Sequence, residues 1–306
     1  MKSWLTLAIG TVVIASLLLF GGNYSLRLGT IFAMYAVLAL SWNFIGGLAG
    51  YPSFATAAFF GLGAYASGIL EGKGIPMPLA WAAAGLVAAG FAGLIGLAIL
   101  HLKGHYFAIA SLALAEVLRE LVSSAADLTG GGMGLNLLVP KGSAQQQAQF
   151  IFAVMLALAA ITAATAIVVR QSKLGFGLRC IQQNEDAAVM LGLDARLYKT
   201  AAFVLSAVFV GVAGAIYASW VHYIEPGDVF DILLAVKPLV MVLIGGIGTL
   251  FGPVIGAAVF LLLEEVVWRN LLTVHAAVLG LLIVALVLFL PGGIAAFDWR
   301  RRARSA

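Results

Sequence analysis

The sequence predicts an all-α polytopic membrane protein with about ten transmembrane helices. Hydrophobic residues make up 63% of the chain and charged residues only 10%, whereas soluble domains average about 45–50% and about 25%. The apolar residues also gather in long runs that are apolar on all sides, unlike the short alternating segments of a β-barrel. These features exclude a secreted disulfide scaffold, a disordered protein and a conventional soluble enzyme. The single cysteine, Cys180, permits no internal disulfide.

The apolar runs are long enough to cross a bilayer, which takes about 20 residues per helix. We expect spans at residues 4–20, 28–49, 54–70, 79–100, 106–125, 150–169, 200–221, 232–247, 253–268 and 271–290. The first run follows Lys2 but has no Ala-x-Ala-like cleavage site after it, so we interpret it as a retained helix. Two of the later runs are short, so eight spans with re-entrant pieces remain an alternative. The 306 residues therefore form one transmembrane domain, 1–306.

The basic residues predict the orientation of the helices, because lysine and arginine are enriched in cytoplasmic loops. With both termini inside, the cytoplasmic side holds eleven of the basic residues and the outer side five. The inner set is Lys2, Lys103, Arg170, Lys173, Arg179, Arg196, Lys199, Arg300, Arg301, Arg302 and Arg304. Segment 170–199 is then cytoplasmic and segment 126–149 periplasmic. The net charge of +4 reflects these loops and does not predict nucleic-acid binding.

A weak internal repeat divides the chain into two pseudo-repeat halves, of which 1–125 is the first. The sequence IGGLAGYP at 45–52 recurs in outline as IGGIG at 244–248 followed by a proline. Paired helices interrupted by glycine and proline mark the central pathway in transporters. The match needs gaps, so chance similarity between apolar stretches is the alternative. The predicted helix-breaking and packing residues are Gly46, Gly47, Pro52, Gly245, Gly246, Gly248, Gly252, Pro253 and Gly256.

Three of these glycines, Gly248, Gly252 and Gly256, recur every fourth residue. Small residues at this spacing let a second helix approach closely. We interpret the stripe as packing within the chain, with a dimer contact as the alternative.

Charged residues occur within one predicted span. Glu116, Arg119 and Glu120 follow the i, i+3, i+4 spacing of a single helix face. Such groups are costly in a membrane and face a partner or a wet cavity. They either border a solute pathway or gate, or form an ion pair that holds helices together. Farther along, Lys237 and Pro238 mark a bend, and we expect the lysine side chain to extend outward.

The segment 127–135 is rich in glycine and includes Thr129, Gly130 and Gly131. It is either a flexible surface loop or a fixed backbone arrangement at the mouth of the pathway. The histidines are dispersed without metal-ligand spacing, so we predict no metal site.

The cytoplasmic segment 170–199 contains a short helix. Asn184 is a good N-cap, and Glu185 and Asp186 suit the first turn of a helix. An apolar stretch follows, including Ala187 and Ala188, and Gly192 ends it. An isolated apolar helix of this length is marginal in water, so it needs a docking partner. The alternative is a helix lying in the bilayer interface.

A P-loop is absent from the sequence. The glycine and lysine at 72–73 lack the first glycine and the hydroxyl residue of that motif. Any ATP hydrolysis must therefore come from another subunit.

The sequence resembles the LivM-type permease subunits of branched-chain amino acid ABC importers. The resemblance covers nearly the whole chain. It rests on segments 53–66, 106–109, 128–135, 184–192, 198–199, 241–248 and 251–253. Gln182 and Gln183 depart from the arginine and acidic residue that the family often has.

The resemblance implies a permease that is not itself an enzyme and holds no cofactor. ATP and Mg²⁺ would be used by two separate ABC ATPase subunits. A LivH-like second permease and a periplasmic solute-binding protein would complete the importer in the bacterial inner membrane. Helix 184–192 would be the coupling helix, and the coupling residues would be Arg179, Asn184, Glu185, Asp186, Ala187, Ala188 and Gly192. The alternatives are import of urea or short amides, and a self-sufficient ion-coupled carrier that uses the charged face of span 106–125.

Overall fold

The computed structural model describes residues 22–137, 142–270 and 280, and within them the chain is almost wholly helical. The helices are α2 (Asn23–Trp42), which runs into a π-helical turn η1 (Asn43–Gly47), α3 (Thr56–Gly72), α4 (Met77–Ile99), α5 (His105–Ser124), α6 (Ala126–Thr129), the 3₁₀ turn η2 (Gly131–Met133), α7 (Ala144–Gln171), α8 (Lys173–Gln183), α9 (Glu185–Met190), α10 (Ala195–Val221), α11 (Pro226–Val229), α12 (Ile232–Gly245) and α13 (Gly252–Asn270). Two short strands, β1 (Leu135–Asn136) and β2 (Tyr223–Ile224), pair antiparallel.

Each span predicted between residues 28 and 268 coincides with a helix. Four helical segments, Asn23–Gly47, Met77–Ile99, Ala144–Gln171 and Ala195–Val221, are long and apolar enough to cross a membrane among the described residues. The chain is thus an all-α, multi-pass membrane protein. The predicted spans 4–20 and 271–290 and the C-terminal arginines lie, apart from Gly280, outside the described residues.

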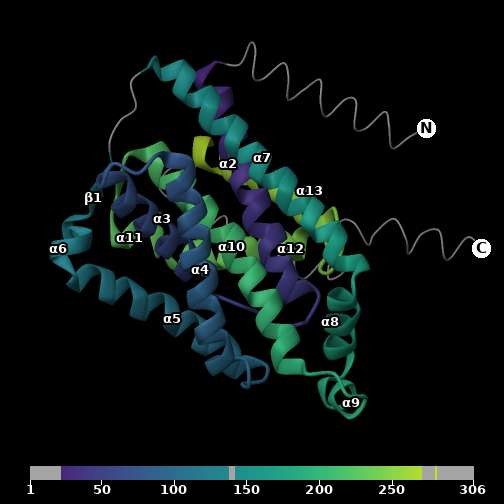
Figure 1. The fold of residues 1–306 in the computed structure, drawn as a ribbon. Helices are drawn as coiled ribbons and strands as arrows, with labels where there is room; N and C mark the ends of the chain where they lie inside the picture. The colour runs from purple at the N-terminus through teal and green to yellow at the C-terminus, as the bar shows by residue number, and fades with distance from the viewer. Residues whose placement is uncertain (1–21, 138–141, 271–279, 281–306) are drawn as a thin grey trace, which may run out of the picture.

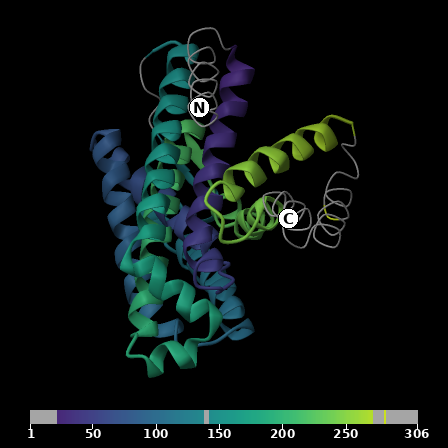
Figure 2. The same ribbon diagram turned by 90° about the vertical axis from the view of Figure 1, so that its right-hand side faces the viewer.

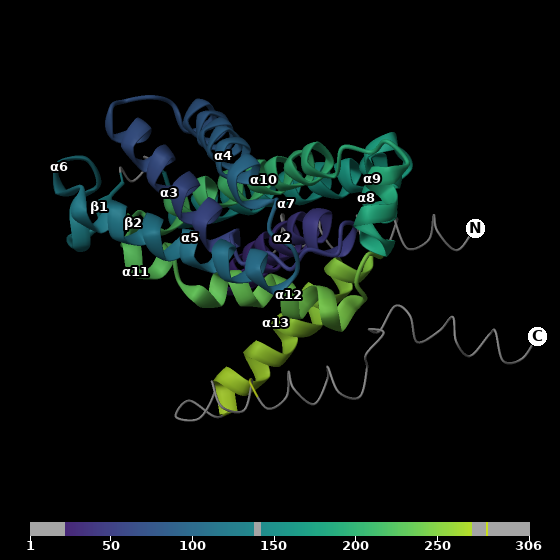
Figure 3. The same ribbon diagram turned by 90° about the horizontal axis from the view of Figure 1, so that it is seen from below.

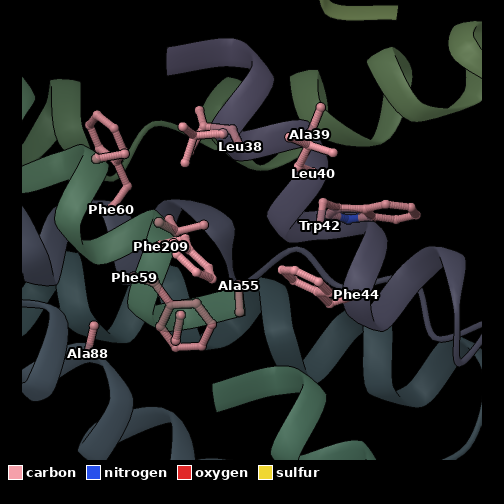
Figure 4. Close-up of a cluster of buried hydrophobic side chains, with 14 of the residues drawn as sticks. Leu38, Ala39, Leu40, Trp42, Phe44, Ala55, Phe59, Phe60, Ala88 and Phe209 are labelled. Atoms are coloured by element: carbon pink, nitrogen blue, oxygen red, sulfur yellow. The ribbon is translucent and has the colours of Figure 1, made fainter. Parts of the chain in front are cut away.

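Helix α10 lies at the centre of the bundle and packs against α2, α3, α4 and α7 (Figure 1). Glycines bring the backbones together, because a Cβ at Gly63 would lie 2.0 Å from the carbonyl oxygen of Gly211. Beside these contacts, aromatic rings such as Phe59, Phe60 and Phe209 fill the core (Figure 4).

The bundle has two distinct ends. Helices α8 and α9 cap one end of the long helices (Figure 2). The strand pair β1–β2, with α6 and α11 beside it, lies at the other end. To one side, α12 packs against α2, and α13 runs away from the body (Figure 3).

Candidate functional site

The short helix α9 has the ends that the sequence predicts. The Oδ1 atom of Asn184 accepts a hydrogen bond from the Ala187 amide at 3.0 Å. At the other end, the amides of Gly192 and Leu193 donate to the carbonyls of Val189 (2.9 Å) and Ala188 (3.1 Å). Gly192 has a φ of +88°, so the helix ends in a Schellman motif, which requires a left-handed residue at this point.

The second turn of α9 is apolar and exposed. Val189, Met190 and Leu191 are 51%, 81% and 84% exposed. Ala188, by contrast, is 2% exposed and packs into the chain. Ala188, one of the predicted coupling residues, therefore packs α9 against the rest of the chain and is not part of its exposed surface. The exposed apolar surface consists of the three residues that follow it.

The first turn of α9 is fixed to the body of the molecule by an ion pair. The Nζ atom of Lys199 lies 2.7 Å from Glu185 Oε1 and 3.2 Å from the Tyr51 hydroxyl. The Tyr51 hydroxyl in turn donates to the other carboxylate oxygen of Glu185. The Lys199 side chain is only 1% exposed. Burial by itself would raise the pKa of Glu185, but the hydrogen bonds from Lys199 and Tyr51 lower it below its ordinary value.

Two further contacts hold the same segment. Asp186 pairs with Lys103, in the turn between α4 and α5, at 2.6 Å. Gln182, at the end of α8, donates to the carbonyl of Gly47 at 3.1 Å. The half-buried Arg179 lies one turn earlier on α8. The segment α8–α9 is therefore bonded to the first glycine break.

The two predicted glycine breaks lie against each other. Asn43 Oδ1 accepts from the Gly248 amide at 3.0 Å, and Asn43 Nδ2 donates to the Thr249 carbonyl at 3.0 Å. A Cβ at Gly47 would lie 1.7 Å from Asn43 Oδ1, so glycine is needed where this side chain crosses. The structure thus joins two stretches that are far apart in the sequence through one buried amide.

The second break continues into close helix packing. A Cβ at Gly245 would lie 1.7 Å from the Gly252 carbonyl, and one at Gly256 would lie 1.8 Å from the Met241 carbonyl. Gly252 and Gly256 of the predicted stripe therefore pack against α12 within the chain. The remaining predicted breakers occupy turns: Gly46 lies in η1, Pro52 precedes α3, Gly246 and Gly248 have positive φ between α12 and α13, and Pro253 lies in the first turn of α13.

The charged face of α5 is exposed within this chain. Arg119 pairs with Glu116 at 2.5 Å, and both side chains face outward. Arg119 and Glu120 line a small cavity of about 270 Å³ together with Glu225, whereas Glu116 lines a separate one. The structure thus divides the predicted gate residues between two surface hollows. An exposed pair of this kind adds little stability, about 0–1 kcal/mol.

The glycine-rich segment after α5 forms a fixed backbone arrangement. Thr129 is buried, and its Oγ1 atom lies 2.6 Å from the Val122 carbonyl and 2.8 Å from the Ala125 carbonyl. Gly130 and Gly131 both have positive φ, which admits the tight turn back toward β1. The geometry therefore favours the ordered alternative for this loop.

A second paired lysine, this one half-buried, was not expected. Lys237 lies 2.8 Å from Glu264 Oε1 and 2.9 Å from the Tyr35 hydroxyl. The sequence does not predict this pairing, because it depends on α13 placing a carboxylate beside Lys237. The outward extension of this half-buried lysine stays a prediction. Glu264 lies 27 residues after Lys237 and Glu185 lies 14 residues before Lys199, so neither pair shows the spacing of neighbours on one helix that a sequence displays.

Comparison with known proteins relates this architecture to a family. The model of the family described as "Branched-chain amino acid transport system / permease component" matches residues 24–290. The chain belongs to this family. Permease proteins named LivM and LivH resemble the chain over most of its length. The high-affinity branched-chain amino acid transport system permease protein LivM of Escherichia coli K12 is 27% identical over 294 residues, which is 87% of this chain and 69% of that protein. The corresponding LivH protein of Salmonella typhimurium is 25% identical over 298 residues, which is 87% of this chain and 92% of that protein.

Proposed function

We propose that this family member is a permease subunit of an ATP-driven importer of branched-chain amino acids. It has ten transmembrane helices with both termini in the cytoplasm of a bacterium, and it lies in the inner membrane. A second, LivH-like permease completes the solute pathway. Two ABC ATPase subunits hydrolyse ATP with Mg²⁺, and a periplasmic binding protein delivers the solute. The similarity to both LivM and LivH supports a paired arrangement of related permeases.

The observation that carries the proposal is the construction of α9. Its acidic first turn is bonded to Lys199, Tyr51 and Lys103. Its second turn leaves Val189, Met190 and Leu191 exposed. A short helix whose first turn is firmly attached and whose second turn is apolar and exposed suits docking into a cleft of a second protein. The ATPase subunit occupies that position in our proposal.

The bonds around α9 also provide a route for movement. The segment α8–α9 contacts the first glycine break through Gln182, and Asn43 contacts the second break. A displacement of α9 by the ATPase would therefore act on both breaks together. Because glycine-rich breaks adapt their backbone easily, we propose that they are where the pathway opens and closes.

The proposal is tested by placing a charge on the exposed face of α9. Met190→Glu puts a carboxylate where an apolar cleft should receive a methionine, and burying an unpaired charge is costly. We expect the amount of copurifying ATPase to fall about tenfold or more. A tenfold weaker association corresponds to about 1.4 kcal/mol of binding free energy. The matched control is Met133→Glu, which makes the same change at a residue 86% exposed at the other end of the molecule.

The measurement is recovery of ATPase subunits with the tagged chain from detergent, together with leucine uptake in cells. Membrane insertion of both variants is checked by their yield in the membrane fraction. Unchanged ATPase recovery and uptake by the Met190→Glu variant would contradict the docking role of α9.

A further inference from the structure

A cavity of about 620 Å³ opens between α2, α10, α11 and α12. Helix α10 starts beside α9 and ends at Val221, which lines this cavity. The cavity therefore lies at the opposite end of α10 from α9. On α2 its lining runs from Arg27 inward to Tyr35, a rise of about 12 Å. The cavity thus leads from the outer end of the molecule into the bundle.

Among the charged side chains on the cavity wall, Arg27 is a cation without an ion-pair partner in the described part of the chain, and Asp228 and Asp231 are carboxylates without one. Lys237 is neutralised by Glu264, and Asp231 accepts a hydrogen bond from the Leu233 amide. Arg27 and Asp228 also line the cavity, and both are exposed. Across residues 22–137 and 142–270, neither has an ion-pair partner within 4 Å. An arginine and an aspartate that share a cavity in this way match a ligand with both a negative and a positive group.

The remaining wall is apolar and aromatic. Ile31 and Met34 come from α2, and Tyr217 and Trp220 from α10. The buried ring of Phe60 lies on the wall from α3. Charged groups and apolar side chains thus share the wall, and the volume is typical of small-molecule sites. Such a wall suits an aliphatic side chain.

We propose that this cavity is a binding site for a zwitterionic α-amino acid with an aliphatic side chain. Arg27 binds the α-carboxylate, because a guanidinium can hold a carboxylate with two parallel hydrogen bonds. Asp228 binds the α-ammonium group, and the side chain of the solute packs on Met34, Tyr217 and Trp220. The assignment rests on the proposed function, which supplies the amino acid class, and adds the residues that receive the solute inside the permease.

The test is photolabelling of the intact importer complex, purified in lipid nanodiscs without the binding protein. The probe is a diazirine analogue of leucine, and the labelled peptides are identified by mass spectrometry. We expect labelling within 27–35 and 217–234 that excess leucine prevents. Leucinamide lacks the carboxylate and 4-methylpentanoate lacks the ammonium group. Each should protect at least about tenfold less well than leucine, because each lacks one of the charge-assisted hydrogen bonds that leucine makes.

The variants separate binding from a structural effect. Arg27→Gln should reduce labelling, and in this variant leucine should protect no better than leucinamide. Asp228→Asn should also reduce labelling, and in that variant leucine should protect no better than 4-methylpentanoate. Lys73→Gln removes another exposed cation outside this cavity and should change nothing. Equal protection by all three compounds, labelling elsewhere, or full labelling of Arg27→Gln would overturn the site and would indicate an apolar surface for lipid or for the second permease. ATPase recovery from the same samples reports separately on the proposed function.

Discussion

Lys199, in the second turn of α10, and Glu185, in the first turn of α9, form a largely buried ion pair, 2.7 Å apart. Because α10 runs through the centre of the bundle, this pair connects a helix at one end of the molecule to its core. Removing one partner of such a pair leaves an uncompensated charge, which is more costly than removing both. The pair therefore fixes the orientation of α9 and predicts how its variants behave.

Glu185→Gln should destabilise the junction by about 3–5 kcal/mol, since it leaves the Lys199 ammonium buried without its counter-ion. The double variant Lys199→Met with Glu185→Gln should lose less than the two single variants together. The measurement is a double-mutant cycle on thermal unfolding of the purified chain in detergent. Strictly additive effects would mean that the two side chains do not interact.

The same junction should resist mild acid. The pKa of Glu185 is lowered, so the contribution of the pair is complete above the ordinary glutamate value of about 4.3 and is lost only as pH falls through the lower folded value. A spin label at position 190, in a Cys180→Ser background, should stay equally immobile from about pH 8 to about pH 5. The Glu185→Gln variant should be more mobile throughout. A rise in mobility between neutral and mildly acidic pH would contradict the lowered pKa.

Asn43→Ala should uncouple ATP hydrolysis from transport. It removes both hydrogen bonds to the second break and leaves the Gly248 amide unpaired, at a cost of about 1–3 kcal/mol. We expect ATPase recovery to remain while leucine uptake per ATP falls, measured in proteoliposomes. Thr30→Ala is the control, since the Thr30 hydroxyl donates within α2, to the Leu26 carbonyl. An Asn43→Ala variant with the same leucine uptake per ATP hydrolysed as the native chain would refute this role of Asn43.

Gly245→Ala should destabilise the packing of α12 on α13. Its Cβ would meet the Gly252 carbonyl at 1.7 Å, and overpacking costs about 1–3 kcal/mol. Gly90→Ala adds the same methyl group to α4, where nothing lies within 4 Å, so it should be neutral or stabilising by up to about 1 kcal/mol. Thermal unfolding in detergent compares the two. Equal midpoints would show that α12 and α13 do not pack as described.

Much of the fold could be predicted from the sequence because the apolar runs are long and bounded by polar residues. Predicted span 79–100 corresponds to α4, Met77–Ile99. Local capping chemistry likewise located both ends of α9, at Asn184 and Gly192. These features depend on neighbouring residues, which a single sequence displays directly.

The remaining features depend on tertiary packing. Asn43 meets Gly248, and Lys237 meets Glu264, only after separate helices have come together. The exposed face of α9 could not be assigned either, because a short helix with an almost wholly apolar second turn has no distinct polar side. Packing decides that Ala188 faces inward and that Met190 faces outward.

The central claim, that α9 docks on an ATPase subunit, is tested most directly by a photo-crosslinking amino acid at position 190. In the complete importer, irradiation should join this position to an ATPase polypeptide, and the same substitution at position 133 should not. Crosslinks from position 190 to lipid alone would contradict the account.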